Sequence, residues 1–387
     1  MQNKIFIVTC LDLKYNTAGK KRLLSYEKML NEKGIKLIFF SFYNGICYAK
    51  DFSEIKSHPK KRSLKNILIF FQFIKNNTLC NGKIKLILYP TSFYFFDIFF
   101  IFYFKFQKKY LLYIELNEVR KYTIRFVKLN SIGAVVKNTR SLIDYTMNSF
   151  TDLCFKFAKG HIYISHKISN YYKKNQSIII PIICNSKCQK LEVPKSYQRG
   201  NCFYLGFAGS IDFEKEKMES LFKTIQKMND YEFNIKINLY GKIYNQNKFD
   251  VVLKNIGFDN TFLKYFGEIN QDVLLKKLRE ENHLMILPRG FSKQNYYGFS
   301  TKLGEYLETN LPIITTLIGD AGIYFIDGKN CFTYNQEKME SLESKLIYIL
   351  NNYDEIVPRI TNGGNALIND FLHYSNHSCA FVKFLND

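Results

Sequence analysis

The sequence contains no CxxC pair, no run of low complexity and no apolar opening stretch long enough for a signal peptide. Its nine cysteines lack the spacing of a metal site, which favours small buried side chains in a reducing compartment over a disulfide or zinc framework. The first apolar run covers only residues 5–10 and is better interpreted as a β-strand. With 47% hydrophobic residues, the 387-residue chain is expected to fold, and its length suits two domains.

Acidic residues are scarce in the first part of the chain. Residues 1–200 contain 35 Lys and Arg against 11 Asp and Glu, a net charge of +24. Residues 201–387 contain 20 against 23, a net charge of −3, and the two parts add up to the +21 of the whole chain. This asymmetry predicts an anionic partner for the first part, either nucleic acid or the inner face of a membrane.

The second part alternates between apolar runs of strand length and helical segments. Strands are predicted at 201–210, 233–241, 261–268, 283–289 and 311–316, and helices at 218–228, 247–257, 271–282 and 300–309. Strands that alternate with helices of about ten residues indicate right-handed βαβ units around a parallel sheet. Residues 201–360 are therefore predicted to form a Rossmann-like domain.

The first part repeats this pattern less cleanly. Strands are predicted at 4–10, 34–42, 83–90, 110–116, 132–138, 160–165 and 177–183. The fold predicted is α/β, with two Rossmann-like domains facing each other across a cleft. The predicted parts are a basic domain over 1–184, a hinge over 185–200, the second domain over 201–360, and a terminal helix in 361–387 that could cross back to the first domain.

An aromatic run at residues 92–110 raises the question of a membrane segment. Asp97 interrupts it, and only about nine residues separate Asp97 from Lys105, whereas a transmembrane helix needs roughly 20. The sequence leaves two interpretations open: a helix in the core of the first domain, or a helix lying on an anionic membrane surface.

The stretch "FSTKLGEYLETNLPIITT", residues 299–316, combines a short helix with a buried strand. Ser300 or Thr301 is the predicted N-cap. Gly304 occupies the position where a capping box would have its glutamate, so Glu305 is not needed for the backbone. The N–H groups of a helix start suit a phosphate, and a carboxylate in the first turns could bind a ribose diol. The alternative is that Lys302 and Glu305 form a surface ion pair.

The longer run "RGFSKQNYYGFSTKLGEYLETNLPIITT", residues 289–316, resembles the donor-binding signature of retaining glycosyltransferases of the GT-B fold, the group 1 or family 4 type. The same order of motifs precedes it: a strand ending at Gly209, then Lys217, Gly241 and Gly267. The resemblance implies a hexosyltransferase that moves a sugar from a nucleotide-diphosphate donor to a lipid-linked or polysaccharide acceptor. It implies work on capsule, O-antigen or similar surface glycans, in the cytoplasm at the inner membrane face.

The resemblance also implies roles for single residues. Glu305 would hold the ribose hydroxyls, and Lys302 would lie near the diphosphate with the backbone of 300–302. Arg289 would replace the arginine that usually follows the first-strand glycine, where this chain has Ser210. The donor-binding residues implied are Gly19, Gly209, Ser210, Gly241, Gly267, Ser300, Thr301, Lys302 and Glu305, and the catalytic ones are Asn117, Glu118, Lys217 and Arg289. Asn117 and Glu118 could equally form a simple turn.

No metal or other cofactor is expected. The chain has no Asp-x-Asp motif, which the metal clamp of the other large glycosyltransferase fold uses, and His373 and His377 lack a third ligand nearby. Gly19 and Lys20 do not form a phosphate loop, because Lys14 stands where its first glycine should be. The alternative functions are a nucleotide-sugar 2-epimerase of the same fold and a basic nucleic-acid-binding protein, although no nucleic-acid-binding module is recognisable.

Overall fold

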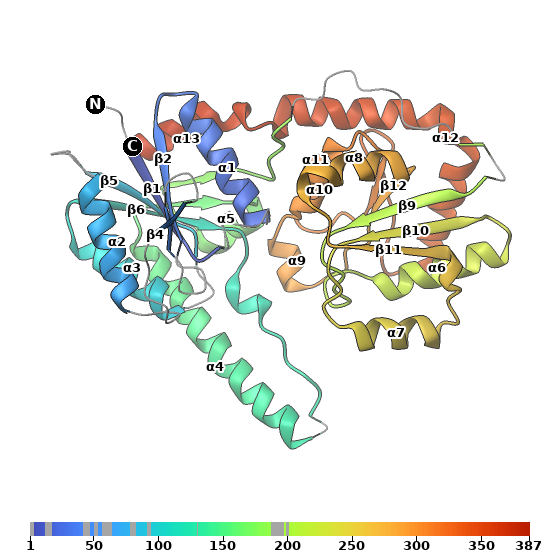
Figure 1. The fold of residues 1–387 in the computed structure, drawn as a ribbon, viewed down its shortest axis with the longest axis horizontal. Helices are drawn as coiled ribbons and strands as arrows, with labels where there is room; N and C mark the ends of the chain where they lie inside the picture. Colours follow the sequence, from blue (N-terminus) through green and yellow to red (C-terminus); the bar gives the residue numbers. More distant parts are fainter. Residues whose placement is uncertain are drawn as a thin grey trace. The chain divides into compact units, whose positions relative to one another are not determined.

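The computed structural model describes residues 4–11, 18–41, 47–49, 53–55, 64–77, 83–90, 94–129, 131–186, 197–198 and 201–387. The chain divides into two compact units (Figure 1). The first unit comprises Met1–Pro181 and Tyr374–Asp387, and the second comprises Ile182–His373. Most of the predicted hinge lies outside the described residues.

The first unit is built on an eight-stranded sheet of order β4-β3-β2-β1-β5-β6-β7-β8. Its parallel strands are β1 (Lys4–Thr9), β2 (Lys36–Ser41), β5 (Ile84–Leu88), β6 (Tyr110–Leu116), β7 (Gly160–Tyr163) and β8 (Ser177–Ile179). Two short strands, β3 (Cys47–Ala49) and β4 (Ser53–Ile55), extend one edge in antiparallel fashion. Six of the seven strands predicted for this part are confirmed.

The predicted strand at 132–138 is wrong, because these residues begin the long helix α4 (Ile132–Cys154). The side chain of Ser131 caps this helix by accepting a hydrogen bond from the Ala134 amide at 3.2 Å. The apolar residues 132, 135 and 136 recur at the spacing of a helix face, and this period decides the local structure of the β-branched run.

The remaining helices of the first unit include the last residues of the chain. They are α1 (Ala18–Asn31), α2 (Leu64–Asn77), α3 (Tyr94–Phe106), α5 (His166–Tyr172) and α13 (Ser375–Asn386), with short 3₁₀ turns at Arg120–Thr123 and Phe155–Phe157. The hydroxyl of Tyr113 in β6 donates to the Leu385 carbonyl at 3.1 Å, and Ser378 donates to Glu32 at 2.9 Å. Helix α13 is therefore an integral part of the first unit.

Helix α3 contains most of the aromatic run. Phe96, Phe100 and Phe104 are buried, and Asp97 is fully buried and paired with Arg120, so this face of the helix belongs to the core. The core interpretation is confirmed for that face, while Phe95 and Phe106 on the other side are exposed. In the described part of the chain, no helix has both the length and the apolar character needed to cross a membrane.

His161 in β7 gives the first unit a predictable response to acid. It is fully buried, with Nδ1 2.8 Å from the Tyr163 hydroxyl and Nε2 2.8 Å from the Phe155 carbonyl oxygen. Burial lowers its pKa to about 4. The unfolded chain takes up a proton at this histidine near its ordinary pKa of about 6.5, so stability falls as the pH drops from 7 to 4.

We expect this histidine to remove about 3 kcal/mol of unfolding free energy between pH 7 and pH 4. Urea unfolding at both pH values should show that loss in the wild type relative to His161→Phe. The titration of the neighbouring Asp152 is common to both proteins and largely cancels from the comparison. An identical pH dependence in the two proteins would contradict the expectation.

The second unit has a six-stranded sheet, entirely parallel, of order β11-β10-β9-β12-β13-β14. Its strands are β9 (Phe203–Ala208), β10 (Ile235–Tyr240), β11 (Leu263–Gly267), β12 (Leu284–Leu287), β13 (Ile313–Thr315) and β14 (Phe332–Thr333). The chain order reverses at β9, which has β10 on one side and β12 on the other. Ligands of doubly wound sheets bind beyond the carboxyl ends of the strands at such a reversal.

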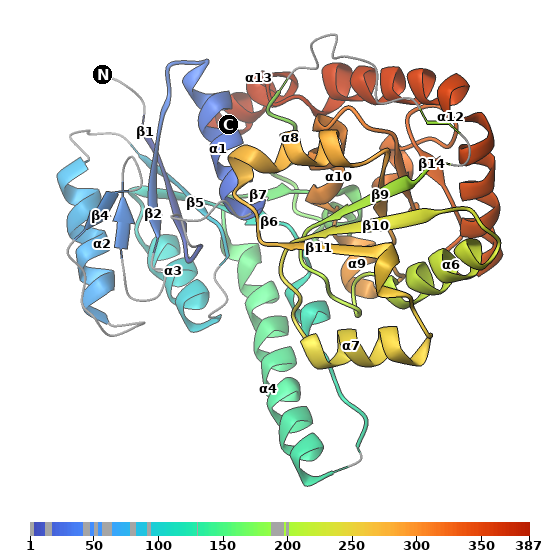
Figure 2. The same cartoon turned by 45° about the vertical axis from the view of Figure 1, so that its right-hand side comes forward.

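Helices connect and cover these strands (Figure 2). They are α6 (Met218–Asp230), α7 (Gln246–Asn255), α8 (Gln271–Glu281), α9 (Lys293–Tyr297), α10 (Thr301–Glu308), α11 (Ala321–Tyr324) and α12 (Met339–Leu367), with short turns at Asn260–Phe262 and Ile368–Leu372. Every strand and helix predicted between residues 201 and 316 is confirmed. The apolar residues on the buried faces of these elements form the core of the unit.

Candidate functional site

Three glycines stand at the carboxyl ends of neighbouring strands in the second unit. Gly209 follows β9 and has a φ angle of +126°; Gly241 follows β10 and has a φ angle of +124°. Gly267 is the last residue of β11 and has a φ angle of +70°. The Gly209 amide donates to the Tyr240 carbonyl at 2.7 Å, and the Gly241 amide donates to the Gly267 carbonyl at 2.6 Å. A Cβ atom at Gly241 would lie 2.4 Å from the carbonyl oxygen of Gly209. The backbone turns here could not accept a side chain at Gly241.

Helix α10 is fixed to the end of β9 by one tyrosine. Tyr306 is fully buried; its hydroxyl donates to the Ala208 carbonyl at 3.0 Å and accepts from the Ala208 amide at 2.9 Å. Ser300 is the N-cap residue, as predicted, although its side chain forms no capping hydrogen bond. The first turn of α10, with the predicted residues Thr301 and Lys302, is thereby held beside the strand-end glycines.

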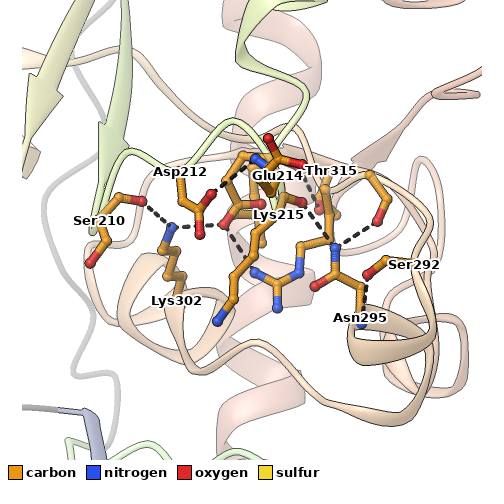
Figure 3. A network of polar contacts seen from close by, with 12 residues as sticks. Ser210, Asp212, Glu214, Lys215, Ser292, Asn295, Lys302 and Thr315 are labelled. Atoms are coloured by element: carbon orange, nitrogen blue, oxygen red, sulfur yellow. Dashed lines mark hydrogen bonds and ion pairs between the residues drawn. The ribbon is translucent and has the colours of Figure 1, made fainter. Parts of the chain in front are cut away.

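Lys302 lies across this edge of the sheet. Its Nζ is 2.9 Å from Oε1 of Glu216 and 3.4 Å from the Ser210 carbonyl oxygen (Figure 3). The same Nζ lies 4.3 Å from the centre of the Phe207 ring. A Cβ atom at Gly209 would lie 2.3 Å from the Lys302 Cε, so glycine is what allows the lysine to pass. Burial lowers the Lys302 pKa, while Glu216 opposes that shift by stabilising the charged form.

Glu216 joins two of the predicted cations. Arg289 Nη1 lies 2.9 Å from the same Oε1 that binds Lys302, and the Glu216 side chain is only 1% exposed. Sequence reasoning missed Glu216, which immediately precedes the predicted Lys217, because an acidic residue there resembles any charged helix start. The proposed surface pair of Lys302 with Glu305 is wrong, because Lys302 forms its ion pair with Glu216. The half-buried Glu305 carboxylate, one turn further along α10, also favours the charged form of Lys302.

Backbone contacts bring Lys217 to the same place. Its amide donates to the Pro288 carbonyl at 2.6 Å, and its aliphatic chain passes over Gly290, where a Cβ atom would be 3.0 Å from the Lys217 Cε. Asn295 holds this loop by donating to the carbonyl oxygens of Lys215 and Gly290 at 2.9 and 2.7 Å (Figure 3). Lys217 is exposed, and no ion pair to it is found among the residues described.

In the first unit, two predicted residues come together around a tyrosine that the sequence did not point to. The Asn117 amide donates to the Tyr89 hydroxyl at 2.5 Å, and a Cβ atom at Gly19 would lie 3.2 Å from that hydroxyl. These residues stand at the carboxyl ends of β5 and β6 and at the first turn of α1. Glu118 follows Asn117 in the same bend.

A buried ion pair between Arg22 and Glu115 lies close to Tyr89. The Arg22 Nε lies 2.6 Å from Glu115 Oε1, and the Tyr26 hydroxyl donates to Oε2 of Glu115 at 2.5 Å. The other Arg22 nitrogens donate to the carbonyl oxygens of Ile180 and Pro181 at 2.6 Å each. Within the described ranges, no three His, Cys, Asp or Glu side chains are grouped as a metal site would require.

Comparison with known proteins identifies the fold. No family model matches the chain. It is 23% identical over 240 residues to the uncharacterized glycosyltransferase MJ1178 of Methanocaldococcus jannaschii; the match covers 57% of this chain and 62% of that protein, which is less than two thirds of its length. Sucrose-phosphate synthase from Thermosynechococcus elongatus superposes with a TM-score of 0.71 at 10% identity, over 99% of this chain and 98% of that one. Anabaena Alr3699/HepE, solved with UDP-glucose, gives 0.63 at 10% identity over 99% of both chains.

The chain has the GT-B fold. The predicted α/β class with two Rossmann-like domains is thus confirmed, and the structural matches extend over nearly the whole chain. In this GT-B chain the predicted donor-binding residues of the second unit lie along the carboxyl edge of the sheet, from the end of β11 to the reversal of strand order at β9. There, Arg289 and Lys302 share the Glu216 carboxylate, and Glu305 also attracts Lys302. The Lys217 side chain passes over Gly290, which follows Arg289.

Proposed function

We propose that the protein is a retaining, metal-independent hexosyltransferase. It transfers a sugar from a nucleotide-diphosphate donor to a lipid-linked or polysaccharide acceptor in the synthesis of a surface glycan such as capsule or O-antigen. The observation that carries the proposal is the cluster of Lys217, Arg289 and Lys302 beside the first turn of α10, at the reversal of strand order. The GT-B fold and the UDP-glucose bound to Alr3699/HepE support it.

The chemistry follows from where the charges lie. When the sugar leaves its nucleotide, negative charge grows on the departing diphosphate, and cations already fixed in place stabilise that charge without reorganising. Lys302 is largely desolvated, so its attraction to a phosphate oxygen is less screened than at the surface. Arg289 is held by the same carboxylate, and the exposed Lys217 would complete the set from the start of α6.

Backbone and carboxylate groups would orient the donor. The N–H groups at 300–302, at the start of α10, suit a phosphate, and Glu305 would accept hydrogen bonds from the ribose hydroxyls. The glycine turns at Gly209, Gly241 and Gly267, with Ser210, would let the nucleotide approach the backbone. In the first unit, Gly19 would let the backbone approach the donor phosphate. Asn117 and Glu118 would act on the transferred sugar or its acceptor. In the cytoplasm, the basic first part of the chain would hold the enzyme against the anionic inner face of the membrane.

Nucleotide-dependent stabilisation tests this proposal. The purified protein is mixed with a panel of UDP- and GDP-sugars, and its thermal unfolding is followed. A ligand at 100 times its Kd should add about 2.7 kcal/mol of stability, which raises the Tm of a chain of this size by several degrees. Glu305→Ala should abolish the shift, whereas Glu219→Ala, at an exposed glutamate of α6 that pairs with Lys223, should keep it.

A flat response to every nucleotide-sugar and nucleotide diphosphate would contradict the proposal. Slow hydrolysis of one donor without acceptor would identify the base and the sugar. Conversion of a UDP-sugar into its 2-epimer would instead establish the epimerase alternative. A salt-sensitive gel shift with short oligonucleotides, in the absence of any nucleotide effect, would favour nucleic-acid binding.

A further inference from the structure

Helix α4 projects from the first unit, and within the described part of the chain only its inner flank is covered. Figures 1 and 2 both show it extending away from the sheet beside an extended segment. That segment, residues 124–129, is fastened to α4 by Asn138, which exchanges two 2.8 Å hydrogen bonds with the backbone of Val127. Ser141 adds a 2.9 Å hydrogen bond to the Arg125 carbonyl. These hydrogen bonds hold residues 124–129 against the inner flank of the helix, and the outer flank faces solvent.

The outer flank carries an apolar stripe. It consists of seven side chains, each between 48% and 86% exposed: Ile132, Val135, Val136, Leu142, Ile143, Phe150 and Leu153. Their spacing places all of them within one third of the helix circumference, along its whole length. Thr139 and Thr146 lie within the same arc, and their hydroxyls donate back to the helix carbonyls of Val135 and Leu142 at 3.0 and 2.9 Å. So many exposed apolar side chains on one face are rare on a soluble monomer and mark a surface that binds something.

A basic cavity adjoins the stripe at the carboxyl end of α4. This lysine pocket has a volume of about 810 Å³, and its cationic lining is Lys121, Lys156, Lys159, Lys173 and Lys174. Leu153 lines it as well, so the pocket and the apolar stripe share a residue. The carboxylate in its lining, Asp152, is 5% exposed; one oxygen accepts from the Tyr172 hydroxyl at 2.7 Å, and the other has no hydrogen-bond partner among the described residues.

Charge decides which occupant fits. Residues 120–159, which contain α4 and its neighbouring segments, have eight Lys and Arg against two Asp and Glu. A second copy of the chain would bring the same positive charge against this surface. An anionic bilayer offers negative charge to the lysines and an apolar layer to the stripe, which is how amphipathic helices lie on membranes.

We propose that the apolar stripe and the lysine pocket form one binding surface for an anionic lipid bilayer. The stripe lies at the boundary between headgroups and acyl chains, and the lysine pocket takes the phosphate of a lipid headgroup. The inference rests on the proposed location at a membrane face and names the surface responsible. It moves the membrane contact from the aromatic helix α3 to α4.

Sedimentation with vesicles tests the inference. The full chain is mixed with vesicles of phosphatidylcholine alone or of phosphatidylcholine with phosphatidylglycerol, at low and at physiological salt. We expect binding at least about tenfold stronger to the anionic vesicles. The double variants Val136→Ser with Ile143→Ser, and Lys156→Ala with Lys173→Ala, should each weaken binding about tenfold or more.

The control changes equally exposed residues elsewhere. Val251 and Val273 in the second unit are 54% and 52% exposed, and serine at both positions should leave vesicle binding unchanged. Undiminished binding by either α4-region variant would overturn the inference. A lipid-independent dimer that the stripe variant abolishes would overturn it in favour of a second copy. Because these variants should retain the nucleotide-dependent thermal shift, failure of this inference is distinguishable from failure of the proposed transferase activity.

Discussion

If the proposed transfer reaction is correct, replacing Lys302 by methionine lowers the rate of sugar release from the nucleotide by about 10²–10³ while the protein stays folded. The methionine side chain keeps the aliphatic bulk that crosses Gly209, and it removes the charge. Charge removed from a pre-organised, desolvated position is not replaced by water, because the Phe207 ring and the Gly209 turn occupy the space around it. The loss should therefore appear in kcat, where the developing charge is largest.

Two further variants separate the loss of charge from a loss of stability. The lysine's departure leaves the buried Glu216 carboxylate with Arg289 as its remaining partner, so some stability should be lost as well. Adding Glu216→Gln to Lys302→Met should restore much of that stability without restoring the rate. Lys223→Met, which breaks an exposed pair on α6, should change neither. A Lys302→Met enzyme that turns over at nearly the wild-type rate would remove this lysine from the mechanism.

Replacing Gly241 by alanine is expected to destabilise the second unit by several kcal/mol. The new Cβ would lie 2.4 Å from the Gly209 carbonyl oxygen, a backbone atom that cannot turn aside, and φ at this position is +124°. The strain would fall on the junction between β9 and β10, so nucleotide binding should be lost together with stability. Chemical unfolding followed by the intrinsic fluorescence of the tyrosines would measure the change.

Gly257 provides a matched comparison for this substitution. It also has a positive φ, +62°, but a Cβ atom there would have no neighbour within 4 Å. Gly257→Ala should therefore cost only about 1 kcal/mol, the ordinary penalty of a left-handed conformation. Similar losses in the two variants would mean that the contact with Gly209 relaxes and that the close approach of the two turns is not needed for folding.

The sequence predicts the second unit better than the first for a physical reason. Its strands are short, the first three of them end at glycines, and its helices carry one apolar face, so the apolar spacing and the turn residues predict the same boundaries. In the first unit, residues 132–138 contain β-branched side chains that favour a strand locally. The serine cap and the stripe that continues to Leu153 favour a helix, and only a window longer than seven residues contains both signals.

The candidate site shows a similar division. Glycines at strand ends and the start of α10 are visible in sequence because backbone geometry selects the residue type. Glu216 and Tyr89 are not visible, since their importance comes from partners 86 and 28 positions away. A sequence pattern records what a position requires locally, and a buried counter-ion or a shared hydroxyl acquires its role only when distant strands meet.

The placement of α13 has a consequence for how the protein is made. The first unit needs residues from both ends of the chain, because α13 packs against α1 and β8 and Tyr113 bonds to Leu385. During translation, the whole of Ile182–His373 must emerge before that helix arrives, which takes roughly 10 to 40 s at typical elongation rates. The second unit can finish folding while the surface of α1 and β8 that α13 will cover is still exposed, and chaperones can bind there.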